Sequence, residues 1–113
     1  MSNRTDSLVK ALVEQGWDCE QDDNIMQFRK QLDNGEIAKY QVSKTLIDMN
    51  NSYTKHVKNR YEICLIAQYG DSIAYIYCRD TKEEAIEVCD LARSSYPNHM
   101  YAVFDKKTKR YIY

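Results

Sequence analysis

Two apolar runs that flank Gly70-Asp71 constrain the fold of this chain more than any other feature. Both runs lie between Tyr61 and Cys78, and a two-residue Gly-Asp loop between such runs is typical of a β-hairpin. Apolar residues occupy both faces of the two expected strands, so we expect interior strands with a helix on at least one side. The expected register sets Ala67 against Ala74, Leu65 against Ile76 and Ile66 against Tyr75.

Length and composition predict one small domain. A chain of 113 residues with 43% hydrophobic content suffices for a core that buries roughly two thirds of the unfolded surface. No Ser/Gly-rich or Pro-rich stretch marks a linker, so we predict a single α+β domain over residues 1–113. No apolar run approaches the roughly 20 residues that cross a bilayer, and residues 1–6 lack an apolar signal region. A cytoplasmic protein without membrane attachment is expected.

The first segment predicts a short amphipathic helix. Thr5 or Asp6 suits the N-cap position, and Gly16 suits a left-handed residue at the C-terminal end. Trp17 follows directly, and we interpret it as an anchor of the helix end on the core rather than as an exposed binding residue. The apolar positions at helical spacing are Leu8, Val9, Leu12 and Val13.

From Ile25 the apolar period changes to two, which predicts a strand with Met26, Phe28 and Leu32 on its apolar face. A three-residue loop, Asp33-Asn34-Gly35, sets Phe28 against Tyr40 and Met26 against Val42, with Gly35 in the left-handed conformation. A two-residue Asn34-Gly35 turn would place Tyr40 and Val42 on the polar face, so we prefer the longer loop. The second strand is expected to continue through Leu46, Ile47 and Met49.

The segment Thr81-Lys82-Glu83-Glu84 predicts a capping box, in which Thr81 and Glu84 satisfy each other's backbone amides. A helix follows to Ser95, where Pro97 ends it, and a last hairpin joins Met100–Phe104 to Arg110–Tyr113. The predicted order is α-β-β-β-β-α-β-β: two helices and one mostly antiparallel sheet of five to six strands, built from hairpins. The apolar stripe of the second helix is Ala85, Ile86, Val88, Cys89 and Ala92.

No catalytic or metal-binding motif is found in the sequence. The four cysteines, at positions 19, 64, 78 and 89, are widely spaced, which favours reduced thiols over disulfides or a zinc site. The acidic stretch from Asp18 to Asp23 lacks the glycine and distal glutamate of a calcium loop, and we expect a solvated loop there. We expect no cofactor, no metal and no enzymatic activity. An undetected enzyme, with His56 or His99 as general base in a deep pocket, is the third alternative.

Nucleic-acid binding is the second alternative. Charge is balanced overall, at 16 basic and 17 acidic residues, but residues 1–36 carry four positive and eight negative side chains, and residues 37–113 carry twelve and nine. Basic residues interleaved with tyrosines suit phosphates and base faces. The candidates are Lys55, Lys58, Arg60, Lys107, Lys109 and Arg110, with Tyr53 or Tyr111 for stacking.

Ten tyrosines in this length favour a protein interface, because tyrosine contributes large apolar area and a hydroxyl group. The leading hypothesis is a non-enzymatic protein that binds, and thereby inhibits or adapts, a protein partner, or that associates with itself through an edge strand. It is similar in general character to small phage or mobile-element proteins that act on a host protein, although no family motif carries the similarity. The candidate contact residues are Tyr53, Tyr69, Tyr96, Tyr111 and Tyr113, with Asp18, Glu20, Asp22 and Asp23 as mimics of phosphate charge.

Overall fold

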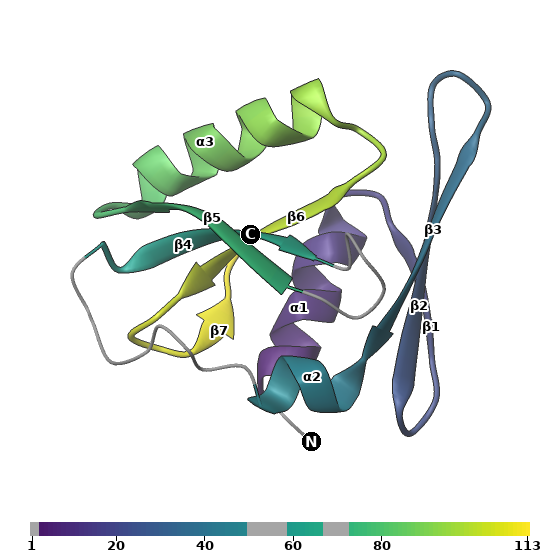
Figure 1. Cartoon of the computed structure of the whole chain (residues 1–113), viewed down its shortest axis with the longest axis horizontal. Helices are drawn as coiled ribbons and strands as arrows, with labels where there is room; N and C mark the ends of the chain where they lie inside the picture. Colours follow the sequence, from purple (N-terminus) through teal and green to yellow (C-terminus); the bar gives the residue numbers. More distant parts are fainter. Residues whose placement is uncertain (1–2, 50–58, 67–72) are drawn as a thin grey trace.

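The computed structural model describes residues 3–49, 59–66 and 73–113, which form an α+β domain with three helices and two antiparallel sheets (Figure 1). The predicted fold class is confirmed, and the predicted order is nearly so: the structure adds one strand and one helix to it. The elements are α1 (Asn3–Glu14), β1 (Asp18–Gln21), β2 (Ile25–Gln31), β3 (Ile37–Ser43), α2 (Lys44–Met49), β4 (Tyr61–Ile66), β5 (Ile73–Arg79), α3 (Lys82–Ser95), β6 (Met100–Asp105) and β7 (Arg110–Tyr111).

The β2–β3 hairpin has the predicted three-residue loop. The Leu32 N–H donates to the Glu36 carbonyl at 2.8 Å, and Gly35 has a φ of 87°. Such a positive φ favours glycine, which lacks the Cβ that clashes in this region. Met26 lies opposite Val42 and Phe28 opposite Tyr40, as expected from matching apolar residues across the two strands.

Helix α1 begins earlier than the sequence predicts. It starts at Asn3, so the expected N-cap at Thr5 or Asp6 is wrong. The Thr5 side chain instead donates to the Asp48 carboxylate at 2.5 Å and thereby joins α1 to α2. The other end is as predicted: Gly16 has a φ of 99°, and the Trp17 side chain is buried at 2% exposure.

Two segments adopt a different structure from the one expected. Residues Asp18–Gln21 form strand β1 rather than a solvated loop, because they pair with β2 and set the half-buried Cys19 opposite Phe28. Residues Lys44–Met49 form helix α2 rather than an extension of β3. The Ser43 hydroxyl accepts a long hydrogen bond from the Leu46 N–H at 3.4 Å, as an N-cap serine does, and so ends the strand.

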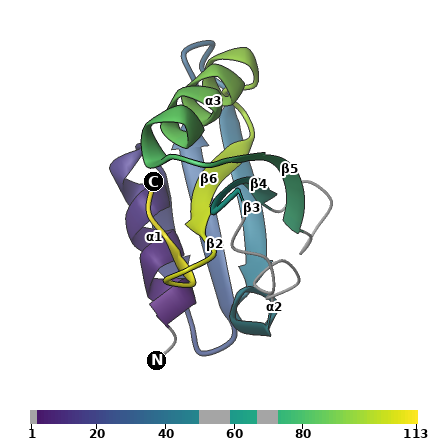
Figure 2. The ribbon, with the colours of Figure 1, turned by 90° about the vertical axis from the view of Figure 1, so that its left-hand side faces the viewer.

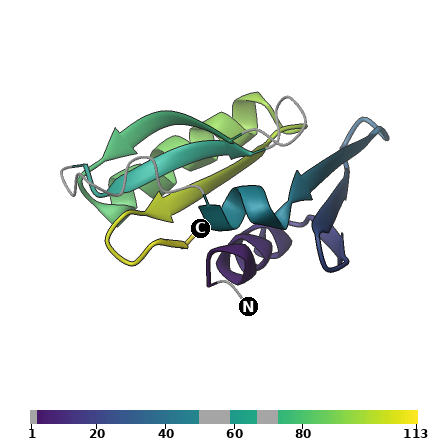
Figure 3. The ribbon, with the colours of Figure 1, turned by 60° about the horizontal axis from the view of Figure 1, so that its bottom comes forward.

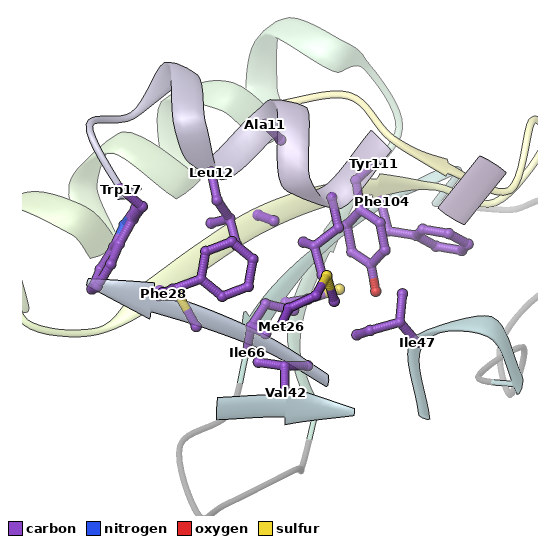
Figure 4. Close-up of a cluster of buried hydrophobic side chains, with 14 residues drawn as sticks. Ala11, Leu12, Trp17, Met26, Phe28, Val42, Ile47, Ile66, Phe104 and Tyr111 are labelled. Carbon is purple, nitrogen blue, oxygen red and sulfur yellow. The ribbon is translucent and has the colours of Figure 1, made fainter. Parts of the chain in front are cut away.

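The strands divide into two sheets, not the single sheet that we expected. One has the order β1-β2-β3 and the other β5-β4-β6-β7 (Figures 1 and 3). Helix α1 contacts β1 of the first sheet and β6 and β7 of the second. Side chains from both sheets, α1 and α2 therefore converge on one apolar cluster, in which Leu12, Phe28, Ile47 and Ile66 point toward one another (Figure 4).

A second apolar cluster lies on the other face of the four-stranded sheet, beneath α3. Ile63 and Leu65 of β4 point into it, whereas Cys64 and Ile66 point into the α1 cluster. Helix α3 begins after Thr81, whose hydroxyl accepts from the Glu84 N–H at 3.2 Å, as predicted. The other half of the predicted capping box differs, because the Glu84 carboxylate accepts from this hydroxyl, at 2.8 Å, rather than from the Thr81 backbone N–H.

The β4–β5 pairing corrects the predicted register. Leu65 lies opposite Ala74 and Ile66 opposite Ile73, whereas the predicted loop at Gly70-Asp71 and the residue Ala67 lie outside the described residues. Apart from Glu62 and Arg79 both strands are apolar, so several registers match apolar with apolar and the pattern does not select one. Strand β5 is also an edge strand of its sheet rather than an interior one.

Strand β5 contains one extra residue. Tyr75 lies opposite Cys64 and Tyr77 opposite Ile63, so Ile76 is a β-bulge with no partner residue on β4. Because directly opposed residues share a face, Tyr75 lies on the face of the α1 cluster and Tyr77 on the face of α3. In a strand without a bulge, residues i and i+2 point to the same face, so Tyr75 and Tyr77 would share one face.

Deleting Ile76 tests this bulge. The deletion leaves Tyr75 and Tyr77 with their present partners and joins them in a regular ladder, so we expect a folded protein whose free energy of unfolding changes by less than about 1 kcal/mol. Deleting Cys64, in the central strand β4, is the control, because it shifts the register on both sides and should unfold the protein. Urea denaturation followed by circular dichroism measures both. Equal destabilisation by the two deletions would contradict the bulge.

Candidate functional site

A groove of about 430 Å³ lies between the edge strand β5 and helix α3. Six large apolar side chains are exposed in the described part of the chain, and four of them line this groove: Leu91 at 64%, Tyr96 at 56%, Tyr77 at 52% and Ile76 at 37% exposure. The other two, Val13 and Ile37, lie elsewhere. The remaining lining residues are Arg79, Val88, Ala92, Ser95 and Tyr101.

The groove results from the positions of α3 and of the bulge. Helix α3 packs more on β6 and β4 than on β5, so it covers the face of β5 only in part (Figure 2). The bulge at Ile76 directs Tyr77 and Arg79 to this face. On α3 the lining residues Val88, Leu91, Ala92 and Ser95 follow at intervals of three and four, which places them along one side of the helix.

An aromatic cluster lies next to the groove, near the C-terminus of α3, and two of its members, Tyr96 and Tyr101, line the groove. The rings of Tyr96 and His99 stack with centroids 5.6 Å apart and an interplanar angle of 13°. The ring centroids of His99 and Tyr101 lie 6.2 Å apart. The Tyr40 hydroxyl donates to the carbonyl of Asn98 and ties this loop to the three-stranded sheet. Burial, then the neighbouring Tyr96, raises the pKa of Tyr101, so its hydroxyl is protonated at neutral pH.

The charges around the groove are unequal. The Arg79 guanidinium lies 5.8 Å from the centre of the Tyr77 ring and donates to the Cys78 carbonyl at 2.7 Å. Glu84 and Glu87 are exposed on α3, and each lies one turn before an apolar lining residue, Val88 or Leu91. The helix wall of the groove therefore has an acidic border, while the strand contributes a single cation.

Three of the five tyrosines that the sequence suggested as contacts belong to the described residues, and they lie in different surroundings. Tyr96 lines the groove. Tyr111 is buried at 5% exposure against Phe104, so the expectation that it lies on the surface is wrong. Tyr113 is half-buried: its hydroxyl donates to Asp90 at 2.6 Å, and Arg93 lies 4.3 Å from its ring centre. Tyr53 and Tyr69 lie outside the described residues.

The acidic candidates lie on β1 and on the turn after it, and none of them lines the groove. Asp18 and Glu20 are exposed on β1, where Asp18 is opposite Arg29. Asp22 and Asp23 are exposed in the β1–β2 turn, and the Asp22 carboxylate accepts from the backbone N–H of Asn24 and of Ile25, at 2.8 Å each. These two hydrogen bonds lower the pKa of Asp22 and give it a structural role in the turn.

Four of the six basic candidates belong to the described part of the chain, and these four lie at or next to the β6–β7 turn. Arg60 lies beside the β6–β7 turn, because its carbonyl accepts from the Lys106 N–H at 2.9 Å. Its guanidinium is held by Asp105 through two hydrogen bonds of 2.7 Å. Lys107, Lys109 and Arg110 are exposed in or next to that turn. Lys55 and Lys58 lie outside the described residues, so the predicted joint surface is not tested.

The groups considered for catalysis are dispersed. All four cysteines are free thiols, and burial raises the pKa of Cys89 to about 11, which keeps it protonated at neutral pH. Among the described residues, no three His, Cys, Asp or Glu side chains gather as metal ligands would. His99 is half-buried in the aromatic cluster, and His56 lies outside the described residues. Each helix within the described ranges is too short or too polar to span a bilayer.

A buried ion pair is the strongest other candidate for a site. The Glu62 carboxylate and the Lys106 ammonium lie 3.1 Å apart, with side-chain exposures of 2% and 6%. Burial raises the pKa of Glu62, and the neighbouring Lys106 opposes that rise. The pair joins β4 to the β6–β7 turn next to the Arg60–Asp105 pair, so its position indicates a structural role.

Of the residues that line the groove, only Tyr96 was predicted from the sequence as a contact. Ile76, Tyr77, Arg79 and Leu91 were not selected as contacts. One signal was present: Leu91 is a large apolar residue of the predicted helix that lies outside its apolar stripe. The adjacent pair Ile76-Tyr77 gave no such signal, because residues 73–78 of that strand are all apolar.

Replacing Asp105 with Asn should make stability depend on pH. Burial alone would raise the pKa of Asp105, but the Arg60 guanidinium and the Lys107 N–H outweigh it, and the pKa lies below its ordinary value of 3.8. The carboxylate thus stabilises the fold above that value, and the stabilisation disappears as the pH falls through the lower folded-state pKa. In urea denaturation at pH 7, Asp105→Asn should cost about 1.5 to 3 kcal/mol, since a hydrogen-bonded charge is lost.

That cost should shrink steadily as the pH is lowered below 3.8. The exposed Asp33→Asn variant is the control and should stay within about 0.5 kcal/mol of the wild type at both ends of the range. Glu62 is unchanged in all three proteins, so its own titration cancels in the comparison. A cost for Asp105→Asn that is independent of pH would contradict the lowered pKa.

A scan against protein-family models finds no matching family, and searches of the curated proteins and of the solved structures find no match. What the groove binds is therefore inferred from its own side chains and from its place in the fold.

Proposed function

We propose that this chain is a non-enzymatic interaction protein that binds a protein partner in the groove between β5 and α3. The observation that carries the proposal is the gathering of Ile76, Tyr77, Leu91 and Tyr96 in that groove, out of six large apolar side chains exposed in the described residues. A contiguous exposed apolar surface is costly to hydrate, and in natural proteins it commonly marks an interaction site.

The composition of the groove supports a protein as the ligand. Tyrosines and an arginine are the residue types that contribute most to protein interfaces, and the groove combines them with leucine and isoleucine. A small-molecule site usually has several polar groups directed at one point. Arg79 is the one charged residue among the described lining residues, and it lies over the Tyr77 ring.

Binding would act by covering a surface of the partner, which inhibits or adapts that partner without chemistry. We place this activity in the cytoplasm. Four unpaired thiols support that compartment, because disulfides are rare in the reducing cytosol. The unequal distribution of exposed apolar side chains also supports one dominant contact surface rather than several weak ones.

Photo-crosslinking tests the proposal. We replace Leu91, in the groove, or Val13, on α1, with p-benzoylphenylalanine, irradiate each protein in lysate of its own cells, and identify the joined proteins by mass spectrometry. Val13 is the matched control because its side chain is also apolar and 48% exposed. We expect one protein to be joined at position 91 and not at position 13.

That protein is then purified and its affinity measured by calorimetry. Leu91→Ser should weaken binding about tenfold or more, since burial of a leucine side chain contributes about 1.5 to 3 kcal/mol. Val13→Ser should leave the affinity unchanged. Both positions are exposed, so both variants should remain folded. Crosslinks at position 13 but not 91, or equal affinities of the wild type and Leu91→Ser, would overturn the proposal.

A further inference from the structure

We infer that the partner inserts an amphipathic helix with a basic flank into the groove, where the helix packs alongside α3 on the face of β5. This inference rests on the proposed function and specifies the element that the partner contributes. It follows from the width of the uncovered sheet face, from the bulge in β5 and from the charges on α3.

The uncovered face has room for one helix. Neighbouring strands lie about 4.8 Å apart, so a four-stranded sheet is wide enough for two helices of about 10 Å diameter side by side. Here α3 contacts β6 and β4 most and β5 less, so it leaves part of the β5 face uncovered. The C-terminal residues Ile112 and Tyr113 pack against the far side of the same cluster. The strip beside α3 on β5 is therefore where a second helix fits.

The bulge disfavours an added strand. An extended segment that joins an open edge gains its affinity from a continuous row of backbone hydrogen bonds. A bulge bends its strand and disrupts the ladder, and natural sheets use bulges to protect their edges. Ile76 lies in the middle of β5, with three residues on each side, so a segment added there would have only short pairing on either side.

The bulge also disfavours a second copy of this chain. In a symmetric antiparallel pair of β5 strands, opposed residues must point to the same face. Pairing centred on Ile76 would oppose Tyr75 to Tyr77, and these two lie on different faces. The self-association through an edge strand that the sequence suggested is therefore poorly matched to this edge.

The charges on α3 indicate which charge one flank of the partner helix carries. The groove side of α3 carries apolar Val88 and Leu91, and Glu84 and Glu87 lie one turn before them. A helix that lies beside α3 would bring one of its flanks close to these carboxylates. Lysine or arginine on that flank is attracted to them, whereas acidic residues are repelled.

Designed peptides test the inference without knowledge of the partner. The probe is a fluorescein-labelled helix of about 18 residues, five turns, with leucines at intervals of three and four, lysines along one flank and glutamine elsewhere. One control has the same residues in an alternating, strand-like order, and another has glutamate in place of lysine. Fluorescence anisotropy measures the affinity of each peptide for the wild type and for Leu91→Ser, Glu87→Lys and Val13→Ser.

We expect the lysine helix to bind the wild type at least about tenfold more tightly than the alternating peptide, and Leu91→Ser to lose that advantage. Glu87→Lys should reduce the preference for the lysine helix over the glutamate helix, because only Glu84 of the two carboxylates then remains. Val13→Ser should match the wild type. Affinity of the lysine helix that is insensitive to both groove variants, or no binding of it, would overturn the inference.

Other results separate this inference from the proposed function. Tighter binding of the alternating peptide, again lost in Leu91→Ser, would replace the helix with a strand and leave the groove as the docking site. Analytical ultracentrifugation that finds a dimer, dissociated by Leu91→Ser, would replace the partner helix with a second copy. If none of the peptides binds, only the inference of a partner helix is overturned. The crosslinking experiment tests the proposed function independently.

Discussion

The burial of β4 on both faces is the constraint on which the rest of this structure depends. Cys64 and Ile66 need an apolar layer on one side, and Ile63 and Leu65 need one on the other. A sheet buried on both faces must be covered by other elements on each. Helix α1, with the three-stranded sheet behind it, covers the first face, and α3 covers the second (Figures 1 and 4).

The single helix over the second face covers the edge strand β5 only in part, and the bulge determines which side chains that strand exposes. Tyr77 would point toward the α1 cluster if β5 continued in the register of residues 73–75. The extra residue Ile76 turns it to the α3 face, where it lines the groove together with the exposed Leu91. One residue in a strand thus accounts both for a protected edge and for an apolar surface open to a partner.

Local signals in the sequence predicted local structure well. The capping box at Thr81 and Glu84 and the left-handed Gly35 act within a few residues, so their chemistry is visible in the sequence. The register of β5 and the burial of Tyr111 depend on contacts between distant segments. An apolar strand matches an apolar partner in several registers, so neither the bulge nor the groove that it builds could be read from the pattern.

The most direct test of the account is the cross-strand pattern of nuclear Overhauser effects around Tyr77 in the isotope-labelled protein. The bulge predicts backbone contacts from Tyr77 to Ile63 and from Tyr75 to Cys64, with no β4 residue directly opposite Ile76. Backbone contacts from Tyr77 to Glu62 and from Ile76 to Ile63 would show an uninterrupted strand. The Tyr77 ring would then face α1, and the groove that carries the proposed function would not exist.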